Sequence, residues 1–170
     1  TATFIIEDTT DPTIDVEASD LTVECDGLGN GDDLQAWLDS IGTTGAASDT
    51  SSGVGWSNDF TGLSDECGET GSATFTFTAS DDCGNTSTTT ATFIIEDTTD
   101  PTIDVEASDL TVECDGSGNI QDLQAWLDSI GTTGAASDTC SGVTWSNDFT
   151  TLSDDCGETG SATVIFTATD

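Results

Sequence analysis

The sequence predicts an all-β protein made of tandem β-sandwich modules, each with one short helix. Three observations predict this class. The chain contains a long internal repeat, it has short runs rich in Thr, Phe and Ile that are bounded by Gly, Asp and Asn, and it holds six cysteines in 170 residues. β-branched and aromatic runs between turn-forming residues are the usual sign of strands.

The repeat sets the domain organisation. Residues 2–27 recur unchanged as residues 91–116, and a shift of 89 residues aligns 81 positions, of which ten differ. A period of about 90 residues has the size of one immunoglobulin-like sandwich and exceeds that of solenoid repeats. We expect residues 1–11 to be the final strand and linker of a preceding module, 12–96 to be immunoglobulin-like module 1, and 97–170 to be module 2 without its last strand.

Two explanations fit this arrangement. The chain is either a window from a longer tandem array, or a subunit whose N-terminal strand completes the open sheet of the next subunit by strand addition.

The elements of one module follow from local patterns. We expect strands at Thr13–Val16, Leu21–Cys25, Gly45–Ala47, Val54–Asn58, Ala73–Ala79 and Thr88–Glu96. A helix is predicted at Asp33–Gly42, with Asp33 as N-cap and Gly42 as C-terminal stop, because its apolar residues follow helical spacing. Its copy is Asp122–Gly131. Trp37 and Trp126 are expected to anchor the core, and Trp56 and Trp145 to fill the space between the sheets.

The charge excludes several functions. The chain has 34 Asp and Glu and no Lys, Arg or His, which gives a formal net charge of −34. Nucleic acids and anionic membranes repel such a chain, and a triad hydrolase or a Schiff-base enzyme needs the residues it lacks. The sequence also has no apolar run of about 18 residues, so we expect no membrane insertion. We predict that the protein is not an enzyme and that divalent cations are its natural partners.

The cysteines indicate an oxidising, extracellular location. Zinc is the weaker interpretation, because the chain has no His and no closely spaced cysteine pair. In a sandwich, the loops that carry Cys140 and the residue equivalent to Cys83 lie at the same end. We therefore expect Cys140 to pair beyond Asp170, which leaves the disulfides Cys25–Cys67 and Cys114–Cys156. The alternative joins Cys83 to Cys140 across the modules.

Three segments together resemble a known family. They are Glu7–Ile14 (EDTTDPTI), Val143–Asp148 (VTWSND) and Thr76–Asn85 (TFTASDDCGN). These segments are similar to hyalin-type (HYR-like) immunoglobulin-like repeats, and the similarity covers essentially the whole chain. The resemblance implies extended extracellular scaffolding in large secreted adhesins or surface filaments, with neighbouring copies of the same module as partners.

The carboxylates form the candidate site. In a sandwich, the entering strand and two loops share one end, which predicts two acidic clusters. The first comprises Glu7, Asp8, Asp11, Asp49, Asp81 and Asp82, and the second comprises Glu96, Asp97, Asp100, Asp138 and Asp170. Because Ca²⁺ binds six to eight oxygens, calcium is the expected metal that would hold such clusters together.

The predicted function is a structural repeat of an extracellular, cell-surface filament or adhesin stalk, with calcium holding the modules rigidly end to end. The alternatives are a glycan- or ice-binding surface module, which the Thr74/Thr76/Thr78 row suggests, or a subunit that polymerises by donor-strand addition. Candidate glycosylation sites lie at Thr9, Ser40 and Asn85, within the tripeptides Asp8-Thr9-Thr10, Asp39-Ser40-Ile41 and Asn85-Thr86-Ser87.

Overall fold

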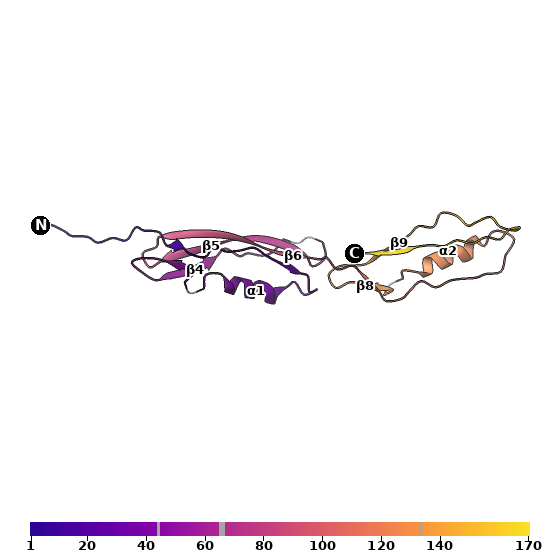
Figure 1. The fold of residues 1–170 in the computed structure, drawn as a ribbon, viewed down its shortest axis with the longest axis horizontal. Coiled ribbons are helices and arrows are strands. Elements are labelled where there is room, and N and C mark those ends of the chain that lie inside the picture. Colours follow the sequence, from indigo (N-terminus) through magenta and orange to yellow (C-terminus); the bar gives the residue numbers. More distant parts are fainter. Residues whose placement is uncertain (44, 65–66, 133) are drawn as a thin grey trace. The chain divides into compact units, whose positions relative to one another are not determined.

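The computed structural model describes residues 1–43, 45–64, 67–132 and 134–170. The chain divides into two compact units, Thr1–Asp97 (unit 1) and Thr98–Asp170 (unit 2) (Figure 1). The described residues form ten strands in four sheets and two short helices. The predicted β-rich class is therefore confirmed, and each copy of the repeat carries one helix.

The main sheet of unit 1 has four strands in the order β2-β6-β5-β4. They are β2 (Leu21–Glu24), β4 (Val54–Asn58), β5 (Gly71–Asp81) and β6 (Thr86–Glu96). β5 and β6 form an antiparallel hairpin, whereas β2 runs parallel to β6. A second, two-stranded sheet pairs β1 (Thr13–Ile14) with β3 (Ala47–Ser48).

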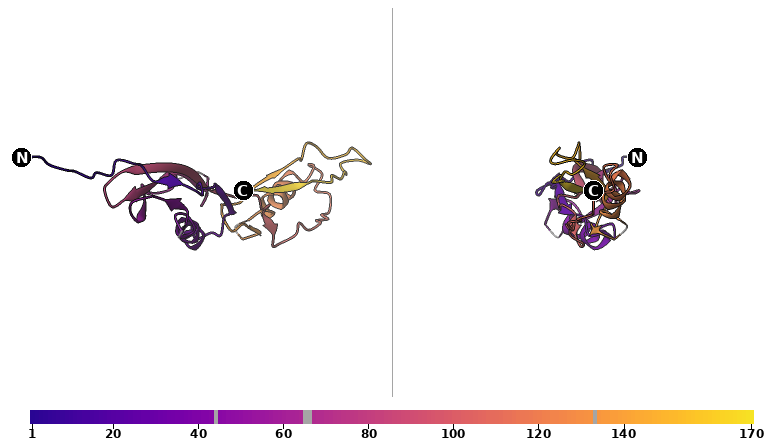
Figure 2. Two further views of the ribbon diagram at one scale, coloured as in Figure 1. Left: turned by 60° about the vertical axis from the view of Figure 1, so that its left-hand side comes forward. Right: turned by 90° about the vertical axis from the view of Figure 1, so that its right-hand side faces the viewer.

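The core of unit 1 lies between one face of this sheet and helix α1 (Gly31–Ser40) (Figure 2). Alternate residues of β5 and β6 are buried, as the two-residue period of a strand requires. Trp37 is 6% exposed, and its ring lies 5.1 to 5.7 Å from those of Phe75, Phe77 and Phe93. Its indole Nε1 donates to the Ser19 carbonyl oxygen at 2.9 Å. The predicted anchoring role of Trp37 is thus confirmed.

Unit 2 repeats the small elements of unit 1 but has a shorter main sheet. It contains β7 (Thr102–Ile103), α2 (Ile120–Ser129), β8 (Ala136–Ser137), β9 (Thr144–Asn147) and β10 (Phe166–Thr169). β7 pairs with β8, and β9 pairs with β10. Trp126 is half-buried and contacts Phe166 edge-on at 5.7 Å, so the predicted anchor is only partly covered.

The helix boundaries differ from the prediction by two residues. The helices span Gly31–Ser40 and Ile120–Ser129, and their N-caps are Asn30 and Asn119 rather than Asp33 and Asp122. Asn30 adopts a left-handed conformation (φ 49°), which Asn tolerates better than most residues. Its amide donates to the Glu24 carbonyl oxygen and to Asp33 Oδ2, so Asp33 supports the cap from within the first turn.

The tryptophan expected between the sheets has a different place. Trp56 is half-buried opposite Ala79 on β5, and its ring covers Gly42 at the end of α1. Gly42 has a φ of +71°, consistent with its predicted role as the residue that follows the helix. The centre of the core is occupied instead by Trp37, because the helix lies directly on the sheet.

Candidate metal centre

Three segments of unit 1 bring acidic residues together. Asp8 lies in the extended segment before β1, Asp49 directly follows β3, and Asp81 ends β5. The segment that holds Asp8 is fixed by two contacts: Asn85 Nδ2 donates to the Asp8 carbonyl oxygen at 3.4 Å, and Ser87 Oγ donates to the Pro12 carbonyl oxygen at 2.6 Å. The loops after β3 and β5 therefore meet the incoming segment at one end of the unit.

One carboxylate oxygen from each of Asp8, Asp49 and Asp81 lies within 4.8 Å of the other two. At this separation, the repulsion between two charges is about 3 kcal/mol per pair for an effective dielectric constant near 20. The chain has no Lys, Arg or His that could compensate for it. Relief must come from protonation or from a cation in solution.

Hydrogen bonds hold Asp81 in its charged form. Asn85 Nδ2 donates to Asp81 Oδ2 at 2.7 Å, and the backbone amides of Cys83 and Asn85 donate to Asp81 Oδ1 at 2.8 Å. These donors, the Asn85 side chain foremost, lower the pKa of Asp81 although the residue is only 7% exposed. These hydrogen bonds therefore oppose protonation of Asp81, which leaves a bound cation as the favoured way to reduce the repulsion between the three carboxylates.

The carboxylates of Asp49 and Asp8 differ in how many hydrogen bonds they accept. Asp49 Oδ1 accepts the backbone amides of Ser51 and Ser52 at 2.8 and 3.0 Å. Asp8 Oδ1 accepts the Thr10 amide at 3.1 Å, but Asp8 Oδ2 is buried and has no hydrogen-bond partner. A buried carboxylate oxygen without a partner is costly, and a bound cation would satisfy it.

The donor set fits a hard cation. All three ligand atoms are carboxylate oxygens, which Ca²⁺ prefers, and the remaining positions of its coordination shell can be filled by water or carbonyl oxygens. Cys83 lies beside the group, where desolvation and the charges of Asp8, Asp81, Asp82 and Asp49 raise the pKa of its thiol. The three ligand atoms of the group are all oxygens, whereas structural zinc sites are built mainly from Cys and His.

The structure brings together only part of the first predicted cluster. Glu7, Asp11 and Asp82 are exposed and lie outside the group of Asp8, Asp49 and Asp81. The prediction that the two loops share one end is confirmed, because the Asp82 amide donates to Ser52 Oγ at 3.3 Å. Asp81 is the last residue of β5 and is buried, whereas Asp82 lies in the exposed turn that follows.

Two residues of the second predicted cluster belong to unit 1, and three belong to unit 2. Glu96 ends β6 and is exposed, and Asp97 follows it and is half-buried. In unit 2, the Cys140 and Ser141 amides donate to Asp138 Oδ1 at 2.7 and 2.9 Å, which lowers the pKa of Asp138. Asp100 and Asp170 are exposed and line one shallow depression, with Ile103 and Phe166.

The cysteines differ from the predicted pairing. Cys25 and Cys140 are buried and disulfide-bonded, whereas Cys67, Cys83, Cys114 and Cys156 are free thiols. The predicted disulfides Cys25–Cys67 and Cys114–Cys156 are therefore wrong, because three of these four cysteines are free. The alternative disulfide Cys83–Cys140 is also wrong, because Cys83 is free. Cys140 was expected to pair with a residue after Asp170, but it forms its disulfide within the 170 residues. The Cys114 thiol lies instead against the Glu158 carbonyl oxygen at 3.6 Å. The presence of a disulfide agrees with the extracellular location expected from sequence.

Sequence reasoning missed the residue that organises Asp81. Asn85 follows it by four positions and donates both its backbone amide and its side-chain amide to that carboxylate. The pattern Asp-x-x-Gly-Asn, which recurs at Asp26–Asn30 and Asp115–Asn119, was the available signal. In each copy, the Asn amide donates to the Asp Oδ1 four residues earlier, so the motif encodes a local turn.

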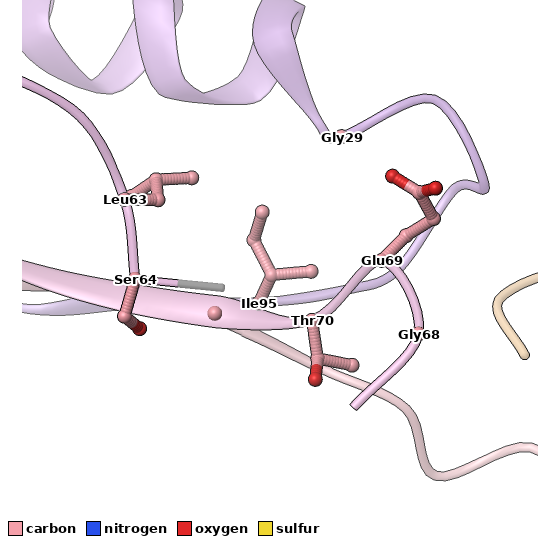
Figure 3. A pocket seen from close by; sticks show the side chains of 8 residues that line it. Gly29, Leu63, Ser64, Gly68, Glu69, Thr70 and Ile95 are labelled. Atoms are coloured by element: carbon pink, nitrogen blue, oxygen red, sulfur yellow. The ribbon is translucent and has the colours of Figure 1, made fainter. Parts of the chain in front are cut away.

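A pocket at the other end of unit 1 has little chemistry of its own. It has a volume of about 170 Å³, and Leu63 and Ile95 face its interior beneath Gly29 (Figure 3). Among the residues of this lining that the structure describes, Glu69 is the one with an ionisable side chain.

Comparison of the chain with family models and with curated proteins finds no match in either. The resemblance to hyalin-type repeats therefore remains a prediction from sequence. No helix in the described parts of the chain is long and apolar enough to cross a membrane.

Proposed function

We propose that this chain is a structural repeat of an extracellular filament or adhesin stalk, built from tandem immunoglobulin-like sandwich modules. In this proposal, Ca²⁺ bound by Asp8, Asp49 and Asp81 fastens the segment that enters unit 1 to the loops that follow β3 and β5. Two observations carry it: the three carboxylates meet, and Asp8 Oδ2 is buried without a hydrogen-bond partner. A metal clamp at this point stiffens the entry to the module, which is what a stalk requires.

Two features support the sandwich part of this proposal. Unit 1 contains two sheets, β2-β6-β5-β4 and β1-β3, whose strands are mostly antiparallel. The near-identity of the two copies extends over their loops and surfaces as well as their cores. Duplication of a whole surface suits a spacer, whose copies all perform the same mechanical role.

The experiment is thermal unfolding of the 170-residue chain in EDTA and in increasing Ca²⁺ at constant ionic strength. A ligand that binds only the native state stabilises it by RT ln(1 + [L]/Kd), which is about 2.7 kcal/mol at 100 times Kd. The melting temperature of unit 1 is expected to rise with Ca²⁺. Mg²⁺ should be less effective, because it gives up its water reluctantly.

Asp8→Asn provides the sharpest variant. Removing one charge relieves repulsion, so the variant is expected to be as stable as the parent or more stable in EDTA, and to lose most of the increment that Ca²⁺ provides. Asp11→Asn is the matched control, because Asp11 is a nearby exposed carboxylate outside the group. An unfolding curve that EDTA leaves unchanged, or an equal Ca²⁺ increment in the parent and Asp8→Asn, would contradict the proposal.

A second candidate function is a surface that binds a glycan or ice. The outer face of β5 and β6 carries three cross-strand threonine pairs: Thr74 with Thr92, Thr76 with Thr90, and Thr78 with Thr88. Their hydroxyls repeat at about 4.8 Å across the strands and about 6.8 Å along them, which gives a regular array. Thermal hysteresis and glycan-array binding test it, and neither should survive Thr76→Asp. Absence of both signals in the parent chain would exclude this function.

A further inference from the structure

The main sheet of unit 1 has one edge whose backbone is open. β4 is the last strand in the order β2-β6-β5-β4, and no other strand of the described residues pairs with it on the side away from β5. Gly55, Ser57 and Asn58 are exposed, and Val54 and Trp56 are half-buried. Unpaired amides and carbonyls along the edge of a sheet are a template for another strand.

The direction of the backbone groups in β4 follows from its neighbour β5. The Thr76 amide of β5 donates to Oδ1 of Asp59, the residue that directly follows β4, at 2.7 Å. Even-numbered residues of β5 therefore direct their amides and carbonyls towards β4, because these groups alternate along a strand. Thr78 is one of them, and it lies opposite Ser57, whose backbone groups must then face β5. The even-numbered residues of β4 direct theirs outward, and these are Val54, Trp56 and Asn58.

Two aspartates protect the sheet at the points where it narrows. Where β4 ends, Asp59 takes the Thr76 amide of β5. Where β2 begins, the Thr92 amide of β6 donates to Asp20 Oδ1 at 2.7 Å. A strand that added beside β5 or β6 would have to displace these carboxylates. Among the described residues, no side chain takes the outward amides of β4 in this way, so β4 is the unprotected edge.

We propose that the outer edge of β4 pairs with the same edge of a second copy of this chain, in the antiparallel direction. A two-fold axis beside Trp56 would place this residue opposite its own counterpart, and Val54 opposite Asn58 of the second copy. Every outward amide of β4 would then meet an outward carbonyl. A register shifted by two residues would leave one of these residues in each copy without a partner, so the two-fold register through Trp56 is specified.

Charge favours a second copy as the occupant. Residues 50–58 carry no charge, although 20% of the chain is acidic. In the proposed register, Asp59 lies opposite Gly53 and is turned back to its own sheet, so it does not face an acid of the second copy. A partner rich in Lys and Arg would be attracted by the charge of −34 and would not prefer an uncharged edge. A second copy, in contrast, can approach closely only where charge is absent.

Unit 2 carries the same edge. Residues 139–147 are also uncharged, and β9 pairs with β10 in the register that β4 has with β5. The Ile165 amide donates to Asp148 Oδ1 at 2.7 Å, as the equivalent Thr76 amide does to Asp59. Each copy therefore offers two equivalent edges. A two-fold contact is closed, so each edge holds one partner.

The first test is hydrogen exchange of the 170-residue chain, followed by NMR over a concentration series at raised ionic strength, which screens the charges. The free thiols are alkylated beforehand, so that disulfides do not form between chains. The Val54, Trp56 and Asn58 amides should exchange rapidly at low concentration and become protected at high concentration. The Gly55 and Ser57 amides should be protected throughout. Sedimentation over the same series should show masses above 17.4 kDa.

The double variant Asn58→Pro/Asn147→Pro tests the edge directly. Proline fits an edge strand where the amide faces solvent, and it removes one outward donor from each edge. Association should weaken by at least about tenfold. Asn58→Ala/Asn147→Ala is the matched control, because it loses the same side-chain contacts with the Phe60 and Phe149 amides but keeps its own backbone amides. It should associate as the parent chain does.

Three results would overturn the proposal. They are a parent chain that stays at 17.4 kDa, association that leaves the three outward amides of β4 unprotected, and a proline variant that associates as the parent does. Two sets of β4 signals in the assembly would also overturn it, because a different segment would then occupy the edge. Neither Asn58 nor Asn147 belongs to the carboxylate group, so Ca²⁺-dependent melting of these variants tests the calcium site separately.

Discussion

The two units share nearly the same sequence but differ in how much of it forms sheet and is buried. Phe77 of β5 is 3% exposed in unit 1, whereas its copy Phe166 is half-buried in unit 2. Residues 21–24 form a strand beside β6, but the identical residues 110–113 do not form one. Since the two copies differ at only ten of 81 positions, the difference follows chiefly from β6, which is present in one unit and absent from the described residues of the other.

Other features are the same in both units. The Trp126 indole donates to the Ser108 carbonyl oxygen, as Trp37 does to Ser19, and both helices have left-handed Asn caps. Gln35 and Gln124 each donate to an Asp one helical turn later. These features depend on contacts close in sequence. The comparison therefore separates structure that short segments encode from structure that requires a distant strand.

The largest effect is expected from removing a core side chain of β6. Phe93→Ala should lower the free energy of unfolding of unit 1 by about 3–5 kcal/mol, because it leaves a cavity beneath Trp37. Phe4→Ala is the matched control: the same residue in the same sequence, but exposed, so its effect should stay within about 0.5 kcal/mol.

Urea unfolding followed by tryptophan fluorescence measures both variants, at protein concentrations low enough to keep the chains monomeric. If Phe93→Ala and Phe4→Ala shifted the midpoint equally, the burial of β6 would not be what distinguishes the two units.

Replacing the glycine that follows each helix should lower the free energy of unfolding by a smaller amount, which should be similar in both units. Gly42 and Gly131 have φ values of +71° and +74°, and a Cβ at either position would meet the ring of the tryptophan that follows in its unit. Alanine at Gly42 should cost about 1–2 kcal/mol for the left-handed backbone and a further 1–3 kcal/mol for overpacking.

Gly29→Ala separates these two terms, because Gly29 has a φ of +83° but an open surrounding. It should therefore show only the backbone cost. Hydrogen exchange of α1 and α2 measures each helix in its own unit. If Gly131→Ala left hydrogen exchange in α2 unchanged, the contact between Gly131 and the Trp145 ring would not stabilise the end of this helix.

The comparison also explains how far the sequence predicted the fold. Strand positions were predictable from alternation of Thr with Phe or Ile, and the β4 prediction matches its observed bounds. The loops of Asp49 and Asp81 were expected at one end of the module, and they meet there. The parallel pairing of β2 with β6 has no local signal, since it joins residues about 70 positions apart.

The metal group illustrates the remaining limit. The sequence predicted an acidic cluster, but eleven candidate carboxylates had equivalent local patterns. What selects Asp8, Asp49 and Asp81 is the side to which each carboxylate turns, and this depends on Asn85 and on the path of the chain around Pro12. The cysteine pairing failed for a related reason: knowing that two loops share one end of a module does not show which thiols come within bonding distance.

The smallest expected effect concerns two carboxylates that should behave alike in the two units. The backbone amides of Asn30 and Leu28 donate to Asp26, and those of Ser117 and Asn119 donate to Asp115. These hydrogen bonds favour the charged form, so the pKa of each residue lies below 3.8.

Because the folded pKa is lowered, the stabilisation from each turn is present above the ordinary pKa of Asp and is lost as the pH falls through the folded value. Carboxyl carbon shifts followed by NMR between neutral pH and strong acid should give midpoints below 3.8 for both Asp26 and Asp115. The Asp26 and Asp115 side chains are both exposed, so solvent screening reduces their contribution and the melting temperature should change little. If Asp115 titrated at the ordinary pKa of Asp while Asp26 did not, the Asp-x-x-Gly-Asn turn would depend on β6. The turn would then belong to the structure that requires a distant strand and not to the structure that short segments encode.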